Sequence, residues 1–148
     1  MNNSILVAIN DSISSRAVMD YIAGLSLSPD NLKITLLHVY RELSSSEELM
    51  GKKFLGKMPT RLLNVLQNAK DKLIENGFNP DKIEIKLVSA SYPTVADGII
   101  DQFKKGEYNM VVIGRKRMSK AEEFVLGDIS VKLVRAIEGA AVLVVKSV

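Results

Sequence analysis

Apolar residues along this chain alternate between short runs and spaced stripes. The runs are four to eight residues long and rich in β-branched side chains, which predicts strands. They cover residues 5–9, 34–39, 83–88, 110–113 and 140–145. Between the runs, apolar residues recur every three or four positions, which predicts amphipathic helices. These stripes cover residues 18–25, 62–73, 95–103 and 129–137.

Strands that alternate with helices in this order predict an open parallel sheet with right-handed crossovers. The runs at 5–9, 110–113 and 140–145 are almost continuously apolar, which indicates strands covered on both faces. The run at 83–88 alternates instead, like a strand near an edge. Because the chain has 148 residues and no internal linker, we expect one α/β domain spanning 1–148.

Residues that start and stop helices agree with this assignment. The candidate N-caps are Asp11 and Ser12, the candidate starts are Pro59 and Pro93, and the candidate ends are Gly77 and Gly139. Residues 41–58 fit neither pattern, because they carry three consecutive serines, two glycines and mixed charges. A connection of this length is typically functional, mobile or locally helical, and a surface loop without a function of its own is the alternative.

Composition removes several classes of function. The chain has no cysteine and a single histidine, His38, which excludes disulfides, cysteine nucleophiles and thiolate or histidine-rich metal sites. Because His38 lies inside an apolar run, we expect a hydrogen-bonded core or strand-end histidine, and we assign no catalytic residue and no metal ligand. The apolar runs are too short to span a bilayer and the first residues lack a signal peptide's basic region. We therefore expect a cytoplasmic protein with no membrane partner.

Residues 111–130 carry the most chemical information. A buried strand ends at Gly114, a loop with four positive charges within residues 115–120 follows, and Gly127 opens the last helix. Amides at a helix start favour an anion such as phosphate, and arginine binds phosphate well. A solvated surface is the alternative for the charged loop. Neither the glycine-rich dinucleotide fingerprint nor a P-loop occurs in the chain.

Several stretches of the sequence resemble the universal stress protein family, and the resemblance covers essentially the whole chain. They are Ile-Leu-Val-Ala-Ile-Asn-Asp-Ser at 5–12, Leu-Leu-His-Val at 36–39, Val-Ile-Gly-Arg at 112–115, Glu-Glu-Phe-Val-Leu-Gly-Asp-Ile-Ser at 122–130 and Val-Leu-Val-Val at 142–145. The resemblance implies a single Rossmann-like, doubly wound five-stranded parallel sheet of order 3-2-1-4-5 with four helices. It also implies a ligand crevice between the carboxyl ends of the first and fourth strands, where the strand order reverses.

The phosphate motif of the nucleotide-binding members is only partly kept. Those members carry Gly, two residues, Gly, nine residues, Gly and then Ser or Thr after the fourth strand. Gly114 and Gly127 match the first and third glycines, whereas Arg117 replaces the second glycine and Asp128 replaces the hydroxyl residue. A side chain at 117 occupies space near the phosphate, and a carboxylate at 128 satisfies the helix-start amides itself and repels a polyphosphate.

We therefore expect weak binding of ATP or AMP. Two alternatives stay open: the arginines of the loop compensate by clamping phosphate, or Arg117 and Asp128 pair with each other across the phosphate site. Mg²⁺, held by Asp11 and Asp128, is expected only together with a nucleotide.

The candidate nucleotide-binding residues follow from the same resemblance. Asn10 stands where nucleotide-binding relatives usually carry Asp, and its amide keeps both a donor and an acceptor for a base edge. A simple turn and helix cap is the alternative for residues 10–12. The full set is Asn10, Asp11, Ser12, Val39, Gly114, Arg115, Arg117, Gly127, Asp128, Ile129 and Ser130.

The resemblance implies a stress-associated regulatory or adaptor protein, non-enzymatic or nearly so, with unidentified protein partners. It also implies a homodimer through the last strand, where Val142 and Val144 are candidate contacts because an apolar strand edge favours a partner. The alternative is an ATP-binding switch or slow ATP hydrolase, for which no general base is evident. A nucleic-acid partner is disfavoured by a net charge of +3 and by only four tyrosines, four phenylalanines and no tryptophan.

Overall fold

A computed structural model of the chain describes residues 3–9, 13–25, 31–41, 52–90, 92–115, 120–121 and 129–147. The strands are β1 (Asn3–Ala8), β2 (Leu32–Arg41), β3 (Ile83–Ala90), β4 (Met110–Arg115) and β5 (Ala141–Lys146). The helices are α1 (Ile13–Gly24), α3 (Lys52–Glu75), α4 (Val95–Lys105) and α6 (Ile129–Ala136), and η2 (Pro80–Lys82) is a single 3₁₀ turn.

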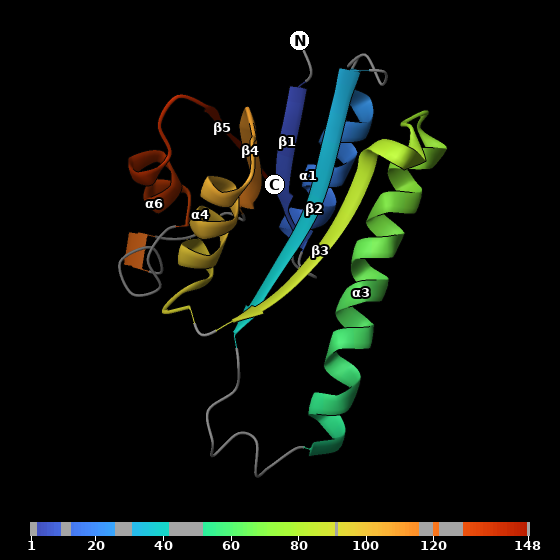
Figure 1. Ribbon diagram of the computed structural model, residues 1–148, viewed down its shortest axis with the longest axis vertical. Helices are drawn as coiled ribbons and strands as arrows, with labels where there is room; N and C mark the ends of the chain where they lie inside the picture. Colours follow the sequence, from blue (N-terminus) through green and yellow to red (C-terminus); the bar gives the residue numbers. More distant parts are fainter. Residues whose placement is uncertain are drawn as a thin grey trace.

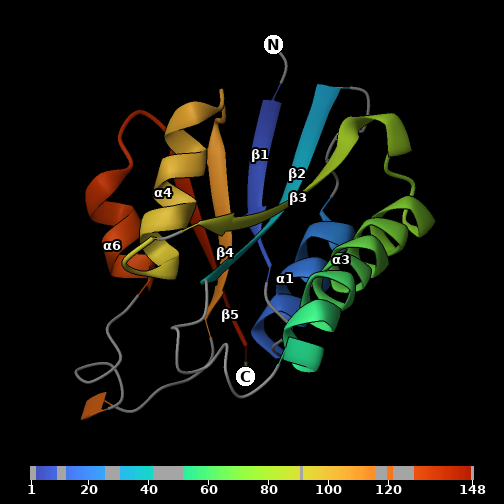
Figure 2. The same cartoon turned by 60° about the horizontal axis from the view of Figure 1, so that its bottom comes forward.

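The five strands form one parallel sheet in the order β3-β2-β1-β4-β5, which confirms the predicted doubly wound topology. β1 lies at the centre, with Ile5 beside Ile34 of β2 on one side and Met110 of β4 on the other. Figure 1 shows α1 and α3 on one face of the sheet and α4 and α6 on the other, and Figure 2 shows the same three layers after a rotation. The strand order reverses between β1 and β4.

Each face of the sheet carries its own hydrophobic core. On the α1 and α3 face, Val18, Ile22, Leu66 and Leu73 pack against alternate strand residues. On the α4 and α6 face, Ile99 and Phe103 of α4, Leu133 of α6 and Ile137 just after α6 pack against the intervening strand residues. Strand residues at alternate positions therefore supply both cores, as the pleat of a sheet covered on both faces requires.

Most predicted helix boundaries agree with the structure, and one is wrong. Gly77 follows α3 with a φ of 93°, and Gly139 lies between α6 and β5 with a φ of 72°, so both glycines lie near helix ends as predicted. Pro93 lies just before Thr94, whose side chain caps α4 by accepting from the amide of Asp97. α3, however, begins at Lys52 and not near Pro59, because the residues before this proline include good helix formers that extend the helix.

Burial on α1 and β5 differs from the predicted pattern, and the 41–58 excursion is partly helical. Tyr21 lies within the predicted apolar stripe at 18–25, yet it is 47% exposed on α1. β5 lies at an edge, so its apolar residues are only half-buried, contrary to the prediction of cover on both faces. In the 41–58 excursion, Arg41 ends β2 and residues 52–58 belong to α3, while 42–51 lie outside the described residues, as do the candidate N-caps Asp11 and Ser12.

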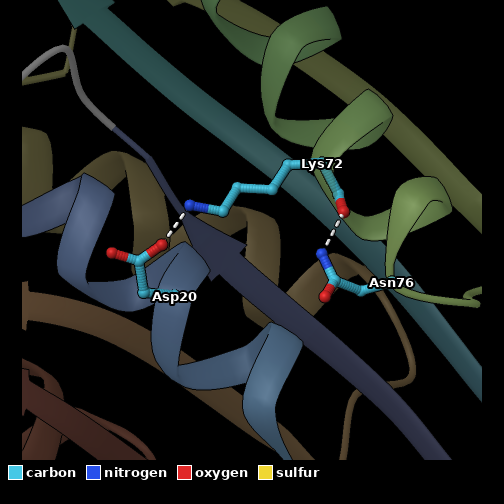
Figure 3. A network of polar contacts seen from close by, with 3 residues as sticks. All are labelled: Asp20, Lys72 and Asn76. Atoms are coloured by element: carbon cyan, nitrogen blue, oxygen red, sulfur yellow. Dashed lines mark hydrogen bonds and ion pairs between the residues drawn. The ribbon is translucent and has the colours of Figure 1, made fainter.

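Polar contacts on the surface join α1 to α3. The Lys72 ammonium forms an ion pair with the Asp20 carboxylate of α1, while the Asn76 amide donates to the Lys72 carbonyl at 2.7 Å (Figure 3). Both charged side chains are well exposed, so the ion pair contributes little to the free energy of unfolding. None of the helices in the described part of the chain is long and apolar enough to cross a membrane.

Candidate functional site

A crevice of about 370 Å³ opens at the carboxyl ends of the central strands. Its residues come from the carboxyl-terminal ends of β1, β2 and β4 and from the starts of α4 and α6. They are Ala8, Ile9, Leu37, His38, Val39, Tyr40, Val95, Ile99, Ile113, Gly114 and Ile129. This position matches the general rule for open α/β sheets, in which ligands bind outside the carboxyl ends of the strands where the strand order reverses.

The first turns of α4 form one wall of the crevice. Val95 and Ile99 lie one helical turn apart, so both side chains line the same hollow. Thr94 fixes the start of this helix, because its hydroxyl accepts from the Asp97 amide at 3.1 Å and donates to the Asp97 carboxylate at 2.6 Å. Ile129 at the start of α6, which is 41% exposed, also lines the crevice.

Hydrogen bonds beyond the end of β1 fix the floor of the crevice. The Ile9 amide donates to the Leu37 carbonyl at 2.7 Å, and His38 Nδ1 donates to the Ile9 carbonyl at 2.6 Å. Because a carbonyl only accepts, Nδ1 carries the hydrogen, and the imidazole ties the end of β1 to β2. The predicted hydrogen bond of His38 is therefore confirmed, although β2 continues beyond this residue to Arg41.

Close packing holds α4 against the floor. A Cβ added to Gly98 would lie 2.6 Å from Cγ1 of Val39 and 2.9 Å from Cδ2 of Tyr92, so only glycine permits this approach. The Tyr92 hydroxyl donates to Asp101 Oδ2 at 2.5 Å, and the Lys105 ammonium lies 2.8 Å from the same oxygen. The hydrogen bond from Lys105, followed by that from Tyr92, lowers the pKa of Asp101 below its ordinary value.

The lining suits a flat apolar group more than a charged one. His38 and Tyr40 are the only polar side chains among the described residues of the crevice, and none of its described residues is Asp, Glu, Lys or Arg. Within the described ranges, no group of three or more His, Asp or Glu side chains is placed to hold a metal ion. The volume falls within the range of small-molecule sites, roughly 300–1,000 Å³.

Comparison with known proteins assigns the chain to a family. A sequence model described as the universal stress protein family matches residues 1–146. The chain belongs to the universal stress protein family. The universal stress protein YxiE of Bacillus subtilis strain 168 is 28% identical over 143 residues, which cover 90% of this chain and 92% of that protein.

Solved structures share the fold of this universal stress protein. A family member from Arabidopsis thaliana, solved with AMP bound, has a TM-score of 0.69 and 19% identity, and the match covers 99% of this chain and 92% of that one. The universal stress protein from Archaeoglobus fulgidus, solved in complex with dAMP, has a TM-score of 0.62 and 15% identity, with 97% and 98% of the two chains covered. At these identities the likeness establishes the fold.

The predicted binding residues of this universal stress protein divide into three groups. Val39, Gly114 and Ile129 line the crevice together. Arg115, which ends β4 beside Lys146, and Ser130, which is 8% exposed on α6, lie outside the lining. Asn10, Asp11, Ser12, Arg117, Gly127 and Asp128 fall outside the described residues, so their roles and the pairing of Arg117 with Asp128 stay predictions.

Sequence reasoning missed most of the residues that line the crevice. Ala8, Ile9, Leu37, His38, Tyr40, Val95, Ile99 and Ile113 were not among the candidates. The available signal was position: several of these residues end a predicted strand, and the strand-end rule applies to each such position. Val95 and Ile99 sit one turn apart at the start of a predicted helix, but the same spacing also describes ordinary core residues.

Val142 and Val144, the candidate dimer contacts of this universal stress protein, lie on β5. Among the described residues this strand pairs only with β4, and both valines are half-buried. The side chains pack against the core under α4 and α6. The outer edge of β5 therefore has no partner strand within the described chain.

Proposed function

We propose that this universal stress protein is a non-enzymatic regulatory protein whose crevice binds an adenine nucleotide weakly, a monophosphate more tightly than a triphosphate. The observation that carries the proposal is the apolar crevice at the point where the strand order reverses. Support also comes from the relatives that carry AMP or dAMP in their solved structures.

The apolar walls are proposed to hold the adenine ring. Val95 and Ile99 of α4 line the same hollow as Val39 of β2 and Ile113 of β4. Burial of an aromatic base against such side chains is favourable, and the backbone of Val39 supplies polar groups for the base edge. Asn10, Asp11 and Ser12 are proposed to contact the nucleoside from the loop that follows β1.

Phosphate is proposed to lie beyond Gly114, toward the start of α6. Arg115, Arg117, Gly127 and Ser130 are the proposed contacts, with helix-start amides and arginine as donors. The carboxylate of Asp128 repels additional phosphates, which is the reason for the preferred monophosphate. Mg²⁺ is proposed to bind only with a nucleotide.

Calorimetry on the purified chain with AMP and ATP, with and without Mg²⁺, tests the proposal. A matched pair of variants locates the ligand on α6. Ile129 lines the crevice and is 41% exposed, whereas Val131 is 43% exposed on the same helix and does not line it. We expect Ile129→Trp to weaken AMP binding by about tenfold or more, and Val131→Trp to leave it within about twofold.

Two results would overturn the proposal. One is the absence of AMP binding combined with the absence of nucleotide in the protein as purified, and the other is equal affinity in both tryptophan variants. Phosphate release from ATP above a blank would favour the ATP hydrolase alternative instead.

Asp128→Ser provides a separate prediction about the phosphate contacts. This substitution restores the hydroxyl of nucleotide-binding relatives and removes a negative charge. We expect ATP affinity to rise by about tenfold, equivalent to about 1.4 kcal/mol, while AMP affinity rises less. An unchanged ratio of ATP to AMP affinity would show that Asp128 does not set the preference.

A homodimer and unidentified cytoplasmic protein partners complete the proposal. The unpaired outer edge of β5 supports a second copy as one partner, because an apolar edge strand tends to pair. The nucleotide would then act as a signal that alters how partners bind, without being consumed.

A further inference from the structure

A second hollow lies at the opposite end of the sheet from the crevice. Its volume is about 550 Å³, and its walls come from the amino ends of β1, β2 and β3 and from the turn that follows α4. Gly106, Glu107 and Tyr108 of that turn form one side. The Tyr108 ring is itself held in place, because it packs against Phe103 with ring centroids 5.7 Å apart.

The floor of this polar groove is built from alternate residues of β2 and β3. Lys33 and Thr35 of β2 and Glu84 and Lys86 of β3 line it, with Thr35 directly beside Glu84 in the sheet register. The residues between them are apolar and belong to the core under α1 and α3. A sheet face that would ordinarily bury apolar side chains is therefore polar at this end.

Thr35 is the unusual member of the floor. The residue is 1% exposed, and its hydroxyl oxygen has no hydrogen-bond partner among the described residues. Buried polar groups without partners are rare in native structures, because such a group loses its bonds to water and gains none in return. Valine has nearly the same shape as threonine and would avoid this loss, so a hydroxyl here calls for a ligand.

The groove around Thr35 is lined by equal numbers of positive and negative side chains. Among the residues that the structure describes, those on the floor form no ion pairs with one another. Six charged residues line the groove: Lys33, Lys82, Lys86, Asp81, Glu84 and Glu107. Across the described parts of the chain, no ion pair involves the three charged residues of the floor. A simple anion would gain from the lysines and be repelled by the carboxylates, whereas a molecule with both charges gains from each.

We propose that the polar groove is a second binding site, separate from the crevice, for a small zwitterion of the α-amino acid class. The ammonium groups of Lys33 and Lys86 attract its carboxylate, and the Thr35 hydroxyl donates to the same group. Glu84 attracts the ammonium group of the ligand. Tyr108 provides the wall against which the rest of the ligand packs.

Titration of the isotope-labelled full chain with L-glutamine, followed by amide NMR, tests the site. At about 10 mM ligand, above the millimolar Kd expected for so small a molecule, we expect shift changes at Thr35, Lys86 and Tyr108. Sodium acetate and methylammonium, which each carry one of the two charges, should bind more weakly by about tenfold.

Two variants and one control separate binding from folding. Thr35→Val should weaken glutamine binding by about tenfold while the Tm stays equal or rises, because the variant removes a buried group without a partner. Lys86→Met should weaken binding by a similar factor. Lys132→Met, an exposed lysine on α6 away from the groove, should change nothing. AMP binding should be unchanged in all three, so this test is independent of the crevice.

Three results would overturn the proposal. The first is the absence of shift changes in the groove with glutamine. The second is a lower Tm for Thr35→Val, which would give the hydroxyl a structural role. The third is acetate binding as tight as glutamine binding, which would make the groove a plain anion site.

Discussion

Gly98 sets the distance between α4 and the sheet beside the crevice. Since a Cβ at this position would lie 2.6 Å from Val39 and 2.9 Å from Tyr92, we expect Gly98→Ala to displace the helix. Overpacking costs about 1–3 kcal/mol and the better helix propensity of alanine returns about 1, so a net loss of about 1 kcal/mol is expected in urea unfolding. AMP affinity should fall as well, because Val39 lines the crevice.

Gly24→Ala is the matched control for this prediction. Gly24 also lies in a helix, α1, but a Cβ there would meet nothing within 4 Å. We expect unchanged stability or a gain of at most about 1 kcal/mol. Equal effects at the two glycines would mean that close approach does not constrain α4.

The contact of Asp101 with Lys105 predicts a pH dependence. Folding lowers the pKa of Asp101 from its ordinary value of 3.8, so the stability it contributes is complete above pH 3.8 and is lost as pH falls through the lower folded value. Folding raises the pKa of Lys105 from 10.5, so that contribution is lost only as pH rises above 10.5.

Asp101→Asn removes the pH-dependent contributions of both Asp101 and Lys105 to stability. We expect the stability difference between wild type and this variant to be constant near neutral pH and to shrink below pH 3.8, as measured by urea unfolding at several pH values. Asp71→Asn, which also removes one exposed carboxylate, controls for net charge. A difference that stays constant down to pH 2 would contradict the assignment.

At the level of single residues, motif and position carry different information. The family motif identified Gly114 and Ile129, because both belong to a contiguous stretch with fixed spacing. Val95, Ile99 and Ile113 could not be recognised in this way, since an apolar residue that lines a crevice has the same pattern as one that fills a core. Thr35 carried no signal at all, because a threonine within a strand is ordinary.

Among the helices, the ion pair between α1 and α3 should contribute little (Figure 3). The side chains of Lys72 and Asp20 are 38% and 60% exposed, so solvent screens their attraction. A double-mutant cycle with Asp20→Asn and Lys72→Met should give a coupling energy of about 0.2–1 kcal/mol. This coupling should disappear in about 1 M salt, and a value that persists there would require a contribution other than charge.

Hydrophobic pattern predicted the presence and type of the elements better than their ends or their surroundings. All five strands were recognised because short β-branched runs between helical stripes have few other interpretations. The start of α3 at Lys52 was missed, since proline is a strong but fallible boundary signal. The half-buried β5 was read as covered on both faces, because burial depends on neighbours that the run itself does not specify.

At the level of the whole molecule, the outer edge of β5 predicts the mode of self-association. If two copies pair through this edge, Val144→Lys should place an ammonium group in the interface and convert the dimer to a monomer. Light scattering on the purified protein measures the change, and Val134→Lys on the exposed face of α6 tests whether that helix participates. An unchanged dimer in Val144→Lys would exclude β5 as the interface.

The arrangement of the strands was not available from the pattern alone. Alternation of strands and helices predicts a parallel sheet, but several strand orders satisfy it. The order 3-2-1-4-5 followed from the resemblance to a family, and the structure has that order. The two hollows at opposite ends of the same face depend on this order, because only the assembled sheet brings their residues together.

The central pairing of β1 with β4 affects how the chain folds during its synthesis. Ile5 lies beside Met110, so one edge of the central strand stays unpaired until a segment more than a hundred positions later has been made. A nascent chain ending near residue 90 would already hold β1, β2 and β3, with the apolar side of β1 open to solvent. During synthesis, one edge of β1 therefore stays unpaired until β4 has been made. A chain stalled before β4 would expose this edge and would be a substrate for chaperones.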